Sequence, residues 1–154
     1  MKGFPPIINK NISILILGSF PSKASLVKQE YYGHPHNQFW KILGKILNEE
    51  LYSADYKTKK DIVLKHNIGI WDVIDGCDRK SSLDSDIKNE QPNNLNKIKK
   101  LAPNLKIVCF NGKKAGSYES VFKEYKTFVL PSTSPAYTLK YAEKLKFWKK
   151  AIKK

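Results

Sequence analysis

Four short apolar segments constrain the fold of this chain more than any other feature of its sequence. They are rich in β-branched or aromatic side chains, and each is ended by a glycine, proline, aspartate or asparagine. Near-continuous apolar runs of this length are typical of parallel β-strands that are buried on both faces. We therefore expect four strands, at Ser13–Gly18, Ile68–Ile74, Lys106–Asn111 and Thr127–Pro131.

Patterns of helical period lie between these segments. In one of them, Phe39, Ile42, Leu43, Ile46 and Leu47 fall on one side of a helix. Strands that alternate with helices predict an α/β fold, a three-layer αβα sandwich with a central four-stranded parallel sheet. The expected helices span Gln38–Asn48, Ala54–His66, Leu95–Leu101, Lys113–Tyr125 and Leu139–Ile152.

The length of the chain bounds its organisation. At 154 residues and 17.7 kDa it fits one compact domain, and its sequence contains neither an internal repeat nor a linker. We expect a single domain over residues 1–154. The polar segment from Gly76 to Asn94 is expected to be an exposed excursion from that domain.

Several classes of protein are disfavoured by what the sequence lacks. No apolar run approaches the ~20 residues of a membrane span, and the first residues lack the apolar stretch of a signal peptide. Cys77 and Cys109 are too few for a disulfide framework, and no Cys or His spacing suggests a metal site. We expect a cytoplasmic protein that has no membrane association and no metal or other cofactor.

The basic charge of the chain is concentrated in its second half. Residues 1–90 carry a net charge of +2 and residues 91–154 a net charge of +12. Only one of the cationic side chains is an arginine, Arg79. A one-sided basic surface attracts polyanions such as nucleic acids, although lysines that merely solvate helix faces would give the same composition.

Small and polar residues gather directly after the expected strands. In a parallel α/β sheet, ligands bind beyond the carboxyl ends of the strands. The segment GSFPSKASL, from Gly18, lacks the GxxxxGK[ST] and GxGxxG patterns, which disfavours a nucleotide-binding loop. The other segments at this edge are residues 72–78, 111–113 and 130–137.

Two segments, one of them that after the last strand, carry residues suited to nucleic-acid chemistry. In YYGHPHNQFW, residues 31–40, adjacent tyrosines offer a stacking surface for a base. Two interpretations of Asn37 in this segment are open. It is either a functional residue of the site or the N-cap of the next helix, a position that asparagine favours. In LPSTSPAY, residues 130–137, two prolines stiffen a loop whose hydroxyl groups suit contacts with phosphates.

These segments, taken in order, resemble the motifs of the uracil-DNA glycosylase superfamily. The segments that carry the resemblance are GSFPS, YYGHPHNQFW, an Asn-Gly pair after a later strand, and LPSTSPAY. Within the superfamily, the sequence resembles most the hypoxanthine-DNA (deoxyinosine) glycosylase branch, family six. The resemblance extends from Ile14 to about Trp148 and implies that the chain acts on DNA containing deaminated bases.

The resemblance implies roles for individual residues. Asn37 would be the catalytic residue, Tyr32 would stack on the extruded base, and Asn111 would read the edge of that base. Phe20 occupies a position where several relatives have a catalytic Asp or Asn, and Ser132 one where many have His or Asn. The base pocket would comprise Gly18, Ser19, Phe20, Tyr32 and Asn111, and the DNA-binding residues would be Ser22, Lys113, Lys114, Ser132, Thr133 and Ser134.

The expected function is therefore that of a monofunctional, monomeric DNA glycosylase, which excises a deaminated base and leaves an abasic site. Hypoxanthine is the expected base, and uracil is the first alternative. A catalytically inactive DNA-binding module is the second, because Phe20 replaces the usual acid or amide. A small-molecule hydrolase is a third alternative, against which the absence of a GxSxG nucleophile elbow counts.

Overall fold

A four-stranded parallel sheet forms the centre of the molecule, in a computed structural model that describes residues 1–152. The strand order across the sheet is β2 (Ile68–Asp72), β1 (Ile14–Gly18), β5 (Ile107–Asn111) and β6 (Lys126–Leu130). All three neighbouring pairs are parallel, and the register pairs Gly18 with Asp72 and Asn111 with Leu130. The carboxyl ends of the strands therefore meet at one edge of the sheet.

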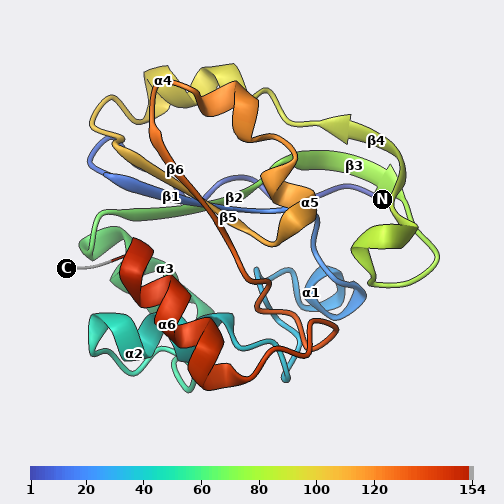
Figure 1. The fold of residues 1–154 in the computed structure, drawn as a ribbon, viewed down its shortest axis with the longest axis horizontal. Helices are drawn as coiled ribbons and strands as arrows, with labels where there is room; N and C mark the ends of the chain where they lie inside the picture. The colour runs from blue at the N-terminus through green and yellow to red at the C-terminus, as the bar shows by residue number, and fades with distance from the viewer. Residues whose placement is uncertain (153–154) are drawn as a thin grey trace.

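Helices cover both faces of this sheet. The longer helices α2 (Phe39–Leu47), α3 (Tyr56–Lys65) and α6 (Tyr141–Ala151) lie on one side (Figure 1). The shorter helices α4 (Ile98–Leu101) and α5 (Lys113–Gly116) lie on the other. This arrangement confirms the expected three-layer α/β sandwich. Within residues 1–152, no helix combines the length and the apolar character needed to span a bilayer.

Polar caps determine where two of the helices begin. The Oγ of Ser22 accepts a hydrogen bond of 3.1 Å from the N–H of Ser25 and begins α1 (Lys23–Lys28), a helix the sequence patterns did not indicate. The carboxylate of Asp55 accepts one of 2.8 Å from the N–H of Thr58 and begins α3. Each cap satisfies a backbone N–H that has no partner inside the helix.

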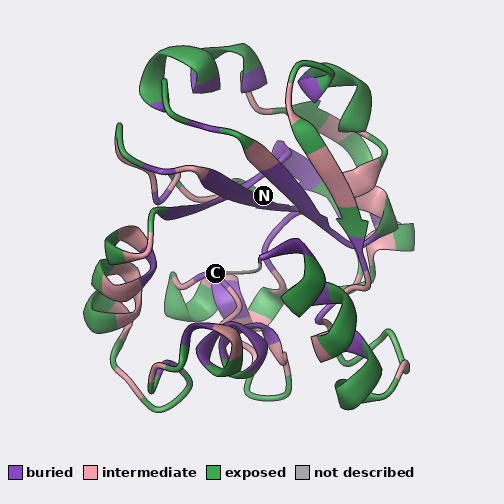
Figure 2. Cartoon of the chain, turned by 60° about the vertical axis from the view of Figure 1, so that its left-hand side comes forward, coloured by how far each residue is buried: buried purple, intermediate pink, exposed green. Residues whose placement is uncertain are grey.

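Strands β1, β2 and β5 of the central sheet are buried, whereas the edge strand β6 is exposed at Lys126 and Val129, which differs from the expectation of a strand buried on both faces (Figure 2). Every residue of β1 and β2 is buried, which agrees with the apolar runs that predicted them. Phe39 and Trp40 of α2 and Trp148 of α6 pack in the same core. The sheet is thus a rigid base for the side chains that follow its strands.

The polar segment 76–94 differs from its expectation. It contains most of an antiparallel hairpin formed by β3 (Ile74–Asp78) and β4 (Lys88–Pro92), and its residues Cys77, Arg79 and Ile87 are buried. The segment is thus exposed along β4, as expected, but it is a paired hairpin with three buried side chains and not an irregular excursion. The chain's first residues cover β3, because the N–H of Cys77 donates to the carbonyl oxygen of Met1 at 3.2 Å.

The expected helix over residues 113–125 is also broken. Helix α5 ends at Gly116, and a separate turn of 3₁₀ helix, η3 (Glu119–Phe122), follows. A Cβ on Gly116 would lie 2.7 Å from the Cγ1 of Val129, so only glycine lets α5 approach β6 this closely. Glycine is also a poor residue for continuing a helix. Helix α5 therefore ends at Gly116, where its backbone packs closely against β6.

Candidate functional site

The carboxyl ends of the parallel strands surround a pocket of about 300 Å³. Ten of the twelve site residues expected from the sequence line it, whereas Lys113 and Lys114 do not. The sheet register explains this convergence, because the loops after β1, β5 and β6 all leave the same edge. The ten residues are Gly18, Ser19, Phe20, Ser22, Tyr32, Asn37, Asn111, Ser132, Thr133 and Ser134.

Gly18 makes room for two larger side chains at the base of the pocket. A Cβ added to Gly18 would lie 2.6 Å from Oδ1 of Asp72 and 2.8 Å from the hydroxyl oxygen of Tyr32. Both oxygens therefore lie directly over the glycine. Any side chain at this position would displace them, so the glycine is required by close approach and not by its backbone angles.

Tyr32 enters the pocket from a strained backbone position. Its φ of 55° lies in the left-handed region, which non-glycine residues rarely adopt. The ring stacks on Phe39 with a centroid distance of 3.9 Å and an interplanar angle of 18°. Its hydroxyl is buried without a hydrogen-bond partner. Burial, followed by the nearby Asp72 carboxylate, raises the pKa of Tyr32, and the side chain of Asn111 beside the hydroxyl opposes this with a smaller effect, so the hydroxyl stays neutral.

Asn111 is held in one orientation by Thr133. Its Nδ2 donates to the Oγ1 of Thr133 at 3.0 Å, and its Oδ1 accepts from the backbone N–H of Thr133 at 3.0 Å. Both residues are buried. Each polar atom of the carboxamide keeps capacity for one further hydrogen bond, since Nδ2 has a second hydrogen and Oδ1 a second lone pair.

Asn37 lies one residue before the N-cap of α2, which is Gln38. Its Oδ1 accepts a hydrogen bond of 2.9 Å from the N–H of Phe39, the first residue of that helix, so it satisfies a free N–H without being the N-cap. The same side chain lines the pocket. The next residue, Gln38, donates its N–H to the carbonyl oxygen of Thr133 at 3.1 Å. This bond ties the segment that carries Asn37 to the loop after β6.

A match to a family model and three similar proteins identify the family of this chain. Residues 5–154 match the model of the uracil DNA glycosylase superfamily. The chain is 42% identical to a hypoxanthine DNA glycosylase of Methanosarcina barkeri, over 99% of this chain and 98% of that protein. It is 46% identical to one from Methanosarcina acetivorans, over 88% and 87%. A third relative is the G/U mismatch-specific uracil DNA glycosylase of Schizosaccharomyces pombe, 30% identical over 86% of this chain and 41% of its own length.

The fold is shared as well. A solution NMR structure of a candidate uracil DNA glycosylase from Methanosarcina acetivorans superposes with a TM-score of 0.90 at 39% identity. That match covers 98% of this chain and 95% of the other. The chain belongs to the uracil DNA glycosylase superfamily. The resemblance indicated by its sequence motifs is thereby confirmed.

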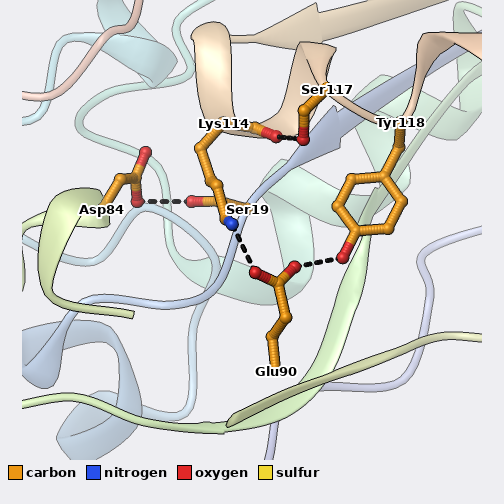
Figure 3. Close-up of polar contacts among 6 residues, drawn as sticks. All are labelled: Ser19, Asp84, Glu90, Lys114, Ser117 and Tyr118. Carbon is orange, nitrogen blue, oxygen red and sulfur yellow. Dashed lines mark hydrogen bonds and ion pairs between the residues drawn. The ribbon is translucent and has the colours of Figure 1, made fainter. Parts of the chain in front are cut away.

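The pocket of this superfamily member also contains two carboxyl groups that the sequence motifs did not single out. Asp72 follows the apolar run of β2, is 3% exposed, and has an Oδ2 without a partner. Burial, together with the nearby carboxylate of Asp84, raises the pKa of Asp72 to about 7. Asp84 accepts a hydrogen bond of 2.6 Å from Ser19 Oγ, and burial raises its pKa as well (Figure 3). An acidic residue within an otherwise apolar strand was the available signal for Asp72.

Arg79 supports the loop after β1 from behind. The side chain is 6% exposed, and its guanidinium donates to the carbonyl oxygen of Pro21 and lies 5.3 Å from the centroid of the Phe20 ring. Its Nε and one terminal nitrogen have no partner. As the only arginine of the chain, it was visible in the composition but had no assigned role.

The two expected phosphate-binding lysines differ in their surroundings. Lys113 is exposed, whereas the ammonium of Lys114 forms an ion pair with Glu90 of β4. The other carboxylate oxygen of Glu90 accepts from the hydroxyl of Tyr118 (Figure 3). Both lysines line a second, more open cavity of about 660 Å³ beside the pocket. The charge of Lys114 is thus already paired within the protein.

Helix α6 fastens the loop after β6. The ammonium of Lys144 is buried and donates to the carbonyl oxygens of Ser134 at 3.2 Å and Tyr137 at 2.7 Å. The indole N–H of Trp148 donates to the carbonyl oxygen of Pro131 at 2.8 Å. These three bonds hold the loop between two points on one helix.

Within residues 1–152, no group of three His, Cys, Asp or Glu side chains is arranged as a metal site.

Proposed function

We propose that this chain is a monofunctional DNA glycosylase that excises hypoxanthine from DNA containing deoxyinosine and leaves an abasic site. Two relatives that match over nearly the whole chain are hypoxanthine DNA glycosylases. The single observation that carries the choice of base is the Asn111 carboxamide, held by Thr133 with one donor and one acceptor position free. The proposal includes a single-domain monomer that acts without a cofactor.

Base flipping is the first step that the pocket requires. A glycosidic bond inside a duplex cannot be reached, so the nucleotide must rotate out of the stack at a cost of a few kcal/mol. That cost is lowest for a mispaired base, and deaminated purines pair badly. The pocket of about 300 Å³ at the edge of the sheet then receives the base.

Asn111 selects a lactam by the pattern of its free positions. Thr133 bonds to the edge of the carboxamide that Nδ2 and Oδ1 share, so the remaining hydrogen of Nδ2 and the remaining lone pair of Oδ1 point away from each other. The carbonyl oxygen of hypoxanthine matches the first of these positions and its ring N–H the second, and the base contacts one of them. Adenine presents an amino group and an unprotonated ring nitrogen, so either contact is mismatched. Rotation of the amide would turn Nδ2 toward the backbone N–H of Thr133 and break that hydrogen bond. Each buried hydrogen bond left unmade costs about 1–3 kcal/mol.

Asn37 is proposed to orient the water that attacks the sugar. The reaction passes through a sugar with oxocarbenium character, as in glycoside hydrolysis, so it needs little nucleophilic push. The second lone pair of Asn37 Oδ1 accepts a hydrogen of the water and directs its oxygen to the sugar carbon. The hydrogen bond from Phe39 N–H fixes the position of that Oδ1. A rigidly positioned water and acceptor lower the activation free energy of the reaction.

DNA contacts are proposed for the exposed and half-buried members of the expected set. They are Ser22, Ser132, Ser134 and Lys113, which lie on loops around the pocket or on α5. Thr133 is fully buried and bound to Asn111, so its proposed role is to orient that residue. Lys114 is paired with Glu90, so its proposed role is structural.

The proposal is tested with labelled duplex oligonucleotides that contain one inosine, uracil or xanthine. Purified protein is incubated with each in EDTA, and abasic sites are cleaved with alkali. Cleavage of the inosine strand is expected. Cleavage of the uracil strand alone would support a uracil glycosylase instead, and binding to every strand without cleavage would support an inactive DNA-binding module.

A further inference from the structure

The carboxyl group of Asp72 lines the pocket, and its buried Oδ2 has no hydrogen-bond partner. Asp72 is the last residue of β2, and the register places it beside Gly18 of β1. Its Oδ1 lies over Gly18, next to the hydroxyl of Tyr32, and its Oδ2 is buried with no hydrogen-bond partner. Buried polar groups are nearly always paired, so an unpaired carboxyl in a ligand pocket indicates a ligand that completes it.

Asp72 and Asn111 are placed on opposite sides of β1. β1 lies between β2 and β5, so the carboxyl group of Asp72 and the carboxamide of Asn111 flank the end of β1 on either side. Both residues line the pocket, so a planar base bound there has polar groups near two of its edges. Asn111 accounts for one set of these contacts and leaves the Asp72 side unassigned.

We propose that Asp72 is a second base-recognition residue, whose carboxyl group donates a hydrogen bond to a carbonyl oxygen of the extruded lactam base. This inference rests on the proposed function, because it assigns a role in the excision of a deaminated base. The donated hydrogen stays on Asp72. The bond between the sugar carbon and the base nitrogen breaks with its electron pair on the base. The attacking water supplies the new oxygen–carbon bond, and the proton that it loses neutralises the departing base.

The surroundings of Asp72 favour a neutral carboxyl group. The groups that face it are Asp84 of η1 (Asp84–Asp86), Arg79 after β3, Tyr31 and Tyr32 before α2, and Tyr56 of α3. Desolvation and the carboxylate of Asp84 raise the pKa of Asp72, and the positive charge of Arg79 opposes them with a smaller effect.

Neutral Asp72 stabilises the departing base better than a carboxylate. Negative charge develops on the base as the glycosidic bond breaks, so a donor becomes a stronger partner in the transition state, whereas a carboxylate repels that charge. A carboxylic acid kept neutral by its surroundings serves as a donor to a developing oxyanion in the same way. The base itself further favours the neutral form, because its growing charge opposes ionisation of Asp72.

The test compares pH profiles of single-turnover excision from inosine DNA, from about pH 5.5 to about pH 9. In the wild-type protein the rate is expected to fall as pH rises through the pKa of Asp72. Asp72→Asn keeps a weaker, permanently neutral donor, so its rate is expected to be about 3- to 10-fold lower than that of the wild type below pH 7, without the falling limb. Asp72→Ala removes the donor and is expected to lose about 10- to 100-fold.

Asp84→Asn is the matched control, because Asp84 is the other pocket carboxyl with a raised pKa. It removes a negative charge near Asp72, so the falling limb is expected to remain and to move to lower pH. A limb that persists in Asp72→Asn, or an Asp72→Ala rate equal to that of the wild type, would overturn the inference. A wild-type protein that excises no deaminated base would instead overturn the proposed function.

Discussion

Asn111 and Thr133 are joined by two hydrogen bonds of 3.0 Å, across the end of β5 and the loop that follows β6. The bonds run in opposite directions, so they determine which atom of the carboxamide is the donor and which the acceptor. An amide that rotated freely would bind adenine as well as hypoxanthine. The loop after β6 therefore contributes to base selection through Asn111.

Replacing Asn111 separates base reading from stability. Asn111→Asp still accepts from the N–H of Thr133, and the hydroxyl of Thr133 can donate to its second oxygen. The fold is thus expected to persist, while loss of the donor lowers the single-turnover rate on inosine DNA by about 10- to 100-fold. Asn111→Ala leaves a buried N–H unpaired and is expected to lower the melting temperature as well. Wild-type rates in both variants would assign Asn111 to the turn before Gly112 alone.

The two roles of Asn37 are separated by its replacement with serine. A serine hydroxyl also accepts a hydrogen bond from the N–H two residues on, so Asn37→Ser is expected to keep the melting temperature near that of the wild type. It lacks the carboxamide, so the single-turnover rate is expected to fall by a factor of about 100 or more with DNA binding retained. Asn37→Ala should lose both rate and stability. Normal excision by Asn37→Ser would leave Asn37 with only the structural hydrogen bond to Phe39.

Lys113 and Lys114 are expected to differ in their response to salt. Lys113 is exposed, so Lys113→Ala should reduce the slope of log K against log[salt] for DNA binding by about 0.9 if the side chain contacts one phosphate. Lys114 is paired with Glu90, and Lys114→Ala should leave the slope nearly unchanged and lower the melting temperature. Equal reductions in slope would show that the ion pair opens on DNA.

Lys144 is expected to act as a clamp on the loop after β6. Lys144→Met fills the same space and leaves the carbonyl oxygens of Ser134 and Tyr137 without their donor. Loss of two hydrogen bonds from a charged donor should lower the free energy of unfolding by about 2–4 kcal/mol. Lys146→Met, at an exposed position of the same helix, is the control. Denaturant titration that gives both variants the same stability would exclude the clamp.

The stability of the protein is expected to depend on pH through Asp72. Its pKa is about 7 in the folded state, above the ordinary value of 3.8. Between these values the folded state binds more protons than the unfolded state, so rising pH lowers stability. Asp72→Asn lacks this titration, and its melting temperature should gain on that of the wild type from about pH 4 to about pH 7. A constant difference between the two proteins over that range would contradict a raised pKa.

The central sheet was predictable from the sequence because three of its strands, β1, β2 and β5, are buried on both faces. Continuous apolar runs such as Leu15–Leu17, bounded by residues that end strands, are typical of such strands. The hairpin of β3 and β4 was not predictable in this way. The strand Lys88–Pro92 has no apolar alternation, and two irregularities interrupt its register with β3. Its strand conformation depends on pairing with β3, which the local sequence pattern does not indicate.

The same distinction holds for the pocket. Residues in recognisable motifs, such as Tyr32 and Asn37, were found because those motifs resemble the motifs of the superfamily, although their segment follows α1 and not a strand. Asp72 and Asp84 belong to no motif, and their importance depends on burial and on each other's charge. The pairing of Lys114 with Glu90 joins residues 24 positions apart through the hairpin that the sequence did not reveal. Such contacts depend on tertiary structure.

The most direct test of the account is to measure the base released from inosine DNA. Purified protein, in EDTA and in excess over a duplex with one inosine, is followed by chromatography of the free base and by alkali cleavage of the strand. The account predicts free hypoxanthine and abasic sites in equal amounts, at a rate about 100-fold or more above that of Asn37→Ser. Failure to release hypoxanthine, or release at the same rate by Asn37→Ser, would contradict it.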